Sequence, residues 1–156
     1  MRVLAEVEYD EVWNAFERKF AFRPSVSGPF PGISEPPDSI TFRLASNVDE
    51  AMLHELKVAL WDAFTACGAW STEIYYLDWQ HECYAIDKLS AESSWVNGFP
   101  DGDYAILLAK DMHTGAFGHP WEQSICLFGD QFVKRVLQSK PRVLTSVMRN
   151  NGRYAA

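Results

Sequence analysis

The chain has 156 residues, 47% of them hydrophobic, and a formal net charge of −7. This length corresponds to about one domain, and the apolar content is far above that of disordered chains. The acidic excess argues against a nucleic-acid-binding protein, because such proteins usually present clustered Lys and Arg. No apolar run approaches the ~20 residues of a membrane span, and the first residues lack the apolar core of a secretory signal. We therefore expect a single cytoplasmic domain over residues 1–156.

A first helix is predicted from Asp10, which suits the capping position, through Phe20. Its apolar residues recur at spacings of three and four, which is typical of a helix with one buried face. Residues 23–38 follow with five Pro and two Gly, a composition that excludes a helix interior or a central strand. We interpret them as an ordered loop that lets the first helix pack on the rest of the domain.

A strand is predicted at 39–44, where Ile40, Phe42 and Leu44 alternate with other residues. The strongest helix pattern spans about 49–67, with Asn47 or Asp49 as its cap and Gly68 after its end. The period then changes to two, which predicts strands at 73–79 and 83–86. Residues 104–109 and 125–128 are apolar on both faces and predict central strands covered on both sides, with a short strand at 116–118 between them.

A last helix is predicted at about 130–138, capped by Asp130, and residues 141–156 are expected to form a loose tail. Strands joined by short turns favour an antiparallel arrangement. The expected fold class is α+β, with a mainly antiparallel sheet of five to six strands and two or three helices packed on it.

The familiar phosphate-binding, nucleophile-elbow and helix-borne zinc motifs are absent from the sequence. The three Cys residues form no disulfide framework and no C-x-x-C pair. No cofactor or metal is therefore assigned. An enzyme with an unfamiliar site stays open.

Histidine at two places offers chemistry near neutral pH. His81 lies between two predicted strands, as a catalytic residue or as a structural one bonded to a backbone carbonyl. His119 lies in the segment GAFGHPWE at 115–122, where Pro120 forces an extended conformation on it. There His119 would be the general base and Glu122 would orient it. Two explanations stay open for the two Gly residues of this segment, close approach of a ligand or a tight hairpin against Trp121.

Carboxylates and aromatic rings supply further candidates. Asp103 lies at the mouth of a buried strand and is a candidate catalytic acid or base. A metal site of His81, His119 and either Glu122 or Asp103 is an alternative, although the sequence spacing of these residues gives it no support. Aromatic side chains near strand ends and loops are typical pocket walls, as well as ordinary core residues. These candidate ligand-binding aromatics are Trp79, Tyr84, Tyr104 and Trp121.

Several segments together resemble one bacterial family, catalogued as domain of unknown function 2716. They are FRPS (22–25), EP (35–36) with SITF (39–42), DWQH (78–81) with CY (83–84), GDY (102–104), and FGHPWE (117–122) with IC (125–126) and FG (128–129). The resemblance covers about residues 8–152 and implies a compact bacterial cytoplasmic domain without an established activity, cofactor or partner. It highlights both His segments and Arg23. The loop between Arg23 and Glu35 would fold over the sheet and bring that pair to the same place.

Three functions remain open at this point. The first is a small-molecule-binding domain or enzyme with a pocket lined by His and aromatic residues, in which His81 and His119 share one cavity. The second is an acidic module that binds a basic protein partner, for example to neutralise a toxin. The third is a homo-oligomeric structural protein. Neither a membrane nor a nucleic acid is an expected partner, and the oligomeric state is open.

Overall fold

The computed structural model describes residues 1–155, which form nine strands, four α-helices and one short 3-10 helix. The helices are α1 (Glu6–Phe20), α2 (Glu50–Ala66), η1 (Ala69–Ser71), α3 (Lys88–Ala91) and α4 (Asp130–Ser139). The strands are β1 (Arg2–Val3), β2 (Ser39–Leu44), β3 (Ile74–Leu77), β4 (Tyr84–Ile86), β5 (Ala105–Ala109), β6 (Gly115–His119), β7 (Ser124–Phe128), β8 (Leu144–Asn150) and β9 (Arg153–Tyr154).

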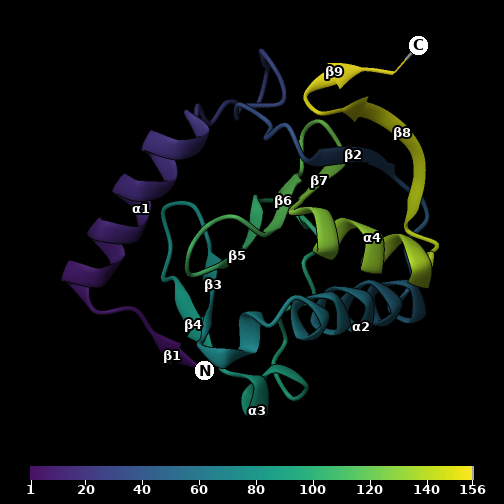
Figure 1. Cartoon of the computed structure of the whole chain (residues 1–156). Coiled ribbons are helices and arrows are strands. Elements are labelled where there is room, and N and C mark those ends of the chain that lie inside the picture. Colours follow the sequence, from purple (N-terminus) through teal and green to yellow (C-terminus); the bar gives the residue numbers. More distant parts are fainter. Residues whose placement is uncertain (156) are drawn as a thin grey trace.

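The strands form one antiparallel sheet in the order β1-β4-β3-β5-β6-β7-β2-β8-β9. The predicted α+β class and antiparallel pairing are confirmed, but the sheet has more strands than the five to six expected, and there are four helices. Helix α1 lies on one face of the sheet, and α2 and α4 pack side by side on the other (Figure 1).

Two hydrophobic cores lie on the two faces of the sheet. Between the sheet and α2 and α4, Phe64 contacts Phe132 with ring centroids 4.7 Å apart. On the opposite face, Phe16 of α1 packs on Phe117 of β6. Every residue of β5, β6 and β7 is buried, as expected for central strands covered on both sides.

The helix ends follow the predicted capping chemistry in part. Asp49 caps α2, since its carboxylate accepts the N–H of Met52 at 2.8 Å, and Gly68 has the positive φ of 75° expected after a helix. The predicted cap at Asp10 is wrong. Helix α1 starts a full turn earlier, at Glu6, where acidic residues of the first turn favour the helix dipole. Asp130 is likewise the first residue of α4 rather than its cap.

The expected loose tail at 141–156 instead contains β8 and β9. Strand β8 pairs with β2 through an irregular register, and β9 pairs with β8. Most of β8 is exposed, so its sequence lacks the apolar alternation that marks a half-buried strand. This strand carries Arg149, the largest fully buried side chain of the described residues.

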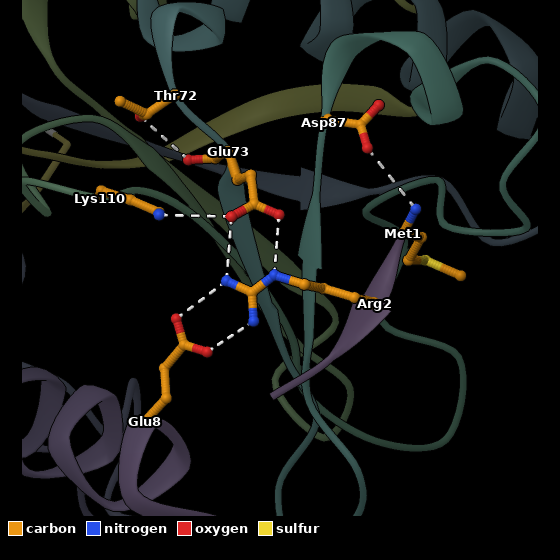
Figure 2. A network of polar contacts seen from close by, with 7 residues as sticks. All are labelled: Met1, Arg2, Glu8, Thr72, Glu73, Asp87 and Lys110. Carbon is orange, nitrogen blue, oxygen red and sulfur yellow. Dashed lines mark hydrogen bonds and ion pairs between the residues drawn. The ribbon is translucent and has the colours of Figure 1, made fainter. Parts of the chain in front are cut away.

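An ion-pair network fastens β1 to its neighbours, as Figure 2 shows. The Arg2 guanidinium bridges Glu8 of α1 and Glu73 ahead of β3, with N–O distances of 2.7 and 2.9 Å. Lys110 adds a contact of 3.4 Å to Glu73. The hydrogen bonds from Arg2 hold the pKa values of both glutamates below their usual range.

Candidate functional site

His119 is the last residue of β6 and is completely buried on the α1 face of the sheet. Its Nδ1 accepts the main-chain N–H of Glu122 at 3.1 Å, across the turn that joins β6 to β7. Strands β6 and β7 pair antiparallel across this turn. The Glu122 main chain, rather than its carboxylate, makes the hydrogen bond to the ring.

Residues 23–33, the covering loop, close over His119. The Phe30 ring meets the imidazole edge-on with ring centroids 4.7 Å apart. Gly32 lies over Nε2, and a methyl group at this glycine would be 3.7 Å from that nitrogen. The hydrogen bonds that hold the loop include Arg23 N–H to Gly32 O at 2.7 Å and Ser25 N–H to the Tyr104 hydroxyl at 3.1 Å. The loop folds over the sheet as expected.

Aromatic side chains complete the surroundings of His119. Tyr104 and Trp121 lie with ring centroids 5.0 and 6.1 Å from the imidazole. Trp79 packs edge-on against Tyr104 at 5.9 Å. Three of the four predicted ligand-binding aromatics thus form one cluster with His119.

A buried charge cluster lies beside this histidine. Arg149 bonds Glu35 at 2.7 Å through Nε and Glu122 at 2.6 Å through Nη2. The side chains of Arg149 and Glu35 are 2% exposed and that of Glu122 is 7% exposed. Thr41 and Ser124 donate to the two carboxylates at 2.7 and 2.6 Å. Buried charges persist where they are paired and hydrogen-bonded in this way.

The titration of these groups follows from their surroundings. Burial lowers the pKa of His119 to about 4, an effect that Glu122 opposes and Arg149 reinforces. Burial alone would raise the pKa of Glu122, but the bonds from Arg149 and Ser124 outweigh it and hold that pKa below its usual range. At pH 7 the site therefore contains a neutral imidazole beside an ionised carboxylate.

The Nε2 atom of His119 is buried and has no hydrogen-bond partner among residues 1–155. Leaving one buried polar group unpaired costs about 1–3 kcal/mol. Such a group in a native structure needs an explanation, and a ligand is one. The atom faces the covering loop, so the loop would have to move for a ligand to reach it.

His81 lies between β3 and β4, at the junction of two strands where the sequence placed it. Strand β3 ends at Leu77, so the predicted strand 73–79 is too long, and residues 78–83 form the turn into β4. The His81 side chain is 63% exposed, with Nδ1 3.1 Å from an Asp78 oxygen and 3.6 Å from an Asp103 oxygen. The hydrogen bond to Asp78 raises the pKa of His81, and burial raises the pKa of Asp78.

Asp78, His81 and Asp103 are the group of potential metal ligands that the structure brings together within residues 1–155. Their ligand atoms lie within 4.8 Å of one another. One imidazole nitrogen and two carboxylate oxygens form a donor set that suits zinc or manganese. The alternative set combining His81 with His119 is not assembled.

An acidic cavity of about 270 Å³ adjoins this corner. Asp78, Asp101 and Asp103 line it together with Tyr76 and Trp95, and no Lys or Arg contributes. The Trp95 side chain is 59% exposed. Tyr84, the fourth predicted ligand-binding aromatic, packs here against Trp95 at 5.7 Å rather than near His119.

His81 and His119 do not share a cavity in the part of the chain that the structure describes. Asp78 and Asp103 line the acidic cavity, whereas His119 lies under the covering loop, on the same face of the sheet as α1. Asp103 and Tyr104 both lie just ahead of β5, and Tyr104 packs its ring against His119 while it also lines the acidic cavity. The expectation of one common cavity is therefore not met, and Tyr104 borders both places.

Other positions depart from the sequence-based expectation as well. The Arg23 side chain is exposed, although its main chain closes the covering loop. Arg149, Phe30 and Asp78 were missed, and no local pattern marks them, because their roles come from contacts with distant segments. A cavity of about 570 Å³ lies between α2 and α3 against Trp61 and includes no predicted site residue.

Comparison with known proteins identifies the family. The chain belongs to the family described as "Protein of unknown function (DUF2716)", whose model matches residues 3–133. It is similar to "Uncharacterized protein YxiI" of Bacillus subtilis (strain 168), with 24% identity over 152 residues, 90% of this chain and 94% of that protein. No solved structure matches. Among the described residues, none of the helices has the length and apolar character needed to cross a bilayer.

Proposed function

We propose that this protein is a small-molecule-binding domain, with an enzymatic reaction as an open possibility, and that its ligand binds at His119 beneath the covering loop. The observation that carries the proposal is the buried Nε2 of His119, which has no partner and faces Gly32 of the loop. A site needs a few polar groups among apolar walls. His119 would supply the polar contact, and Tyr104, Trp121 and Trp79 would supply the walls.

The charged residues of the cluster would support the site rather than touch the ligand. Glu122 positions the imidazole through its main chain, and Arg149 ties Glu122 to Glu35 at the end of the loop segment. Arg23 lies at the base of the covering loop, with its side chain free to meet an arriving ligand. Asp103 lines the neighbouring acidic cavity and His81 lies beside Asp103, so these two residues would act on a second group of the ligand.

The test is a thermal-shift screen of the purified protein against metabolites and divalent metals, repeated with His119→Asn and His119→Ala. The Asn carbonyl can replace Nδ1 as acceptor for Glu122 N–H but offers nothing at Nε2. A compound at 100 times its Kd adds about 2.7 kcal/mol of stability. We expect a hit that His119→Asn abolishes while the unliganded variant melts close to the wild type. The proposal is wrong if the wild type responds to no compound, or if every hit persists in His119→Asn.

A second candidate function, binding of a basic protein partner, is favoured by the acidic cavity. Three carboxylates and no basic side chain line it, beside the exposed Trp95. Tryptophan is a frequent interface anchor, and charge complementarity selects a partner. Binding of Arg- and Lys-containing tripeptides, followed by tryptophan fluorescence, should weaken with salt and be lost in Asp101→Asn. Equal binding of a Gln-containing tripeptide would contradict this function. The homo-oligomeric alternative stays an untested prediction.

A further inference from the structure

The hydrogen-bond pattern of His119 assigns its tautomer. The nitrogen that accepts the N–H of Glu122 carries no hydrogen, and here that nitrogen is Nδ1, at 3.1 Å. A neutral imidazole then carries its single hydrogen on Nε2. The unpartnered atom beneath the covering loop is therefore a donor, and in this tautomer it cannot accept a proton as the expected general base would.

We infer that His119 acts as a neutral hydrogen-bond donor through Nε2 and that the ligand it selects is a planar, uncharged molecule with a carbonyl oxygen. The inference rests on the proposed small-molecule site and names its ligand class. The acceptor oxygen would lie in the plane of the ring, within hydrogen-bond reach of Nε2 and next to Gly32 and Phe30.

The charges around the ring favour an uncharged ligand. Glu122 and Arg149 are the charged groups that act on the imidazole, and Arg149 is already shared between Glu122 and Glu35. The cluster therefore carries two carboxylates for one guanidinium. A buried carboxylate ligand would add a third negative charge without a cation, which is unfavourable.

The aromatic walls favour a planar ligand. Tyr104, Trp121 and Phe30 all meet the imidazole nearly edge-on, at interplanar angles of 66°, 88° and 75°. When Phe30 moves aside, the rings of Tyr104 and Trp121 remain beside the donor, and a flat group gains contact against such rings. The same movement would expose Nε2–H to the ligand.

Two substitutions separate the two nitrogens. His119→Asn keeps an acceptor for Glu122 N–H and removes the Nε2 donor. His119→Gln is long enough to place an amide N–H near the Nε2 position but loses the short acceptor. We expect binding of an uncharged carbonyl compound to weaken about tenfold or more in the Asn variant, a change of about 1.4 kcal/mol, and to be partly retained in the Gln variant.

The experiment is nitrogen-15 NMR of the histidine rings in the whole protein, between pH 5 and 8. His119 should show Nε2 protonated and Nδ1 unprotonated throughout, without titration in that range. Benzamide and benzoate are then added as matched planar probes, one uncharged and one anionic. Benzamide should move the His119 Nε2–H signal in the wild type, and benzoate should not.

The outcomes distinguish this inference from the proposed function. An Nδ1–H tautomer, or protonation of His119 near pH 6.5, overturns the inference while a ligand lost in His119→Asn still supports the site. A stronger response to benzoate, or no response to either probe, shows that the ligand class is wrong. A screen without any hit removes the site itself, whatever the tautomer.

Discussion

At the scale of single residues, His119 and Arg149 are buried polar side chains in opposite situations. Arg149 bonds carboxylates from two other parts of the chain, whereas His119 has one nitrogen satisfied and one without a partner. Full pairing is typical of a group whose role is to hold the structure. An unpaired atom in the same neighbourhood is what a binding site requires before its ligand arrives.

Replacement of Arg149 by Met should destabilise the protein by about 3–5 kcal/mol, because Glu35 and Glu122 would lose their common cation. Urea unfolding measures the change. Arg135→Met is the matched control, since Arg135 pairs with Asp62 on the surface and should cost under about 1 kcal/mol. Equal effects of the two substitutions would show that the buried cluster is not a stabilising unit.

The stability of the protein should fall as the pH drops from about 6.5 to about 4, through His119. Its pKa is lower in the folded state, so the unfolded chain binds the proton first and gains from it. The free energy of unfolding changes by about 3 kcal/mol in total, and it has its full value above pH 6.5. His119→Asn should flatten this slope.

The effect of His81 on the pH dependence of stability has the opposite sign in the same pH range. Its folded pKa is raised through Asp78, so its contribution is present below pH 6.5 and is lost as the pH rises. The pH dependence of stability is therefore compared between the His81→Ala protein and the same protein with His119→Asn added. An unchanged slope in that background would contradict a buried neutral His119.

At the scale of elements, the covering loop and β8 decide the site. Sequence reasoning predicted the loop from its Pro and Gly content and placed both His119 and Tyr104 correctly beside strand ends. Alternation also revealed β2, whose apolar residues face the helices. It failed for β8, where four of seven residues are exposed and the pairing with β2 is irregular.

Phe30→Ala should loosen the covering loop without unfolding the sheet, because the ring contact with His119 is lost while the buried Ile33 still holds the end of the loop in the core. Hydrogen exchange of the Arg23 and Ser34 amides, which bond Gly32 and Phe20, should rise about tenfold. Val26→Ala is the control, since Val26 is an exposed residue of the same loop. The anchor role of Phe30 is refuted if both variants exchange like the wild type.

At the scale of the whole molecule, the chain places its two ends at opposite edges of the sheet, with β1 at one edge and β9 at the other. The contacts that define the site are accordingly long-range. Local patterns could identify His119, Glu122 and Glu35 as candidates, but only the fold shows that Arg149 joins the two glutamates. The separation of His81 from His119 also depends on where the fold places the turn after β3 relative to the end of β6.

Arg2→Ala should cost about 1 kcal/mol or less, although the network in Figure 2 ties β1 to α1 and to the residue ahead of β3. Its partners are partly exposed, so the loss should shrink between 20 mM and 500 mM NaCl as the charges are screened. Melting curves at both salt concentrations measure it. A loss that is independent of salt would point to packing of the Arg2 stem instead.

The position of Arg149 has a consequence for how the protein is made. Arg149 follows Glu35 by 114 residues, and at about 5–20 residues per second a ribosome needs roughly ten seconds to cover that distance. Throughout this time the emerging chain holds Glu35, and later Glu122, without the cation that lets them enter the interior. The nascent protein can assemble its central strands, but the buried charge cluster beside His119 forms only after β8 has left the ribosome.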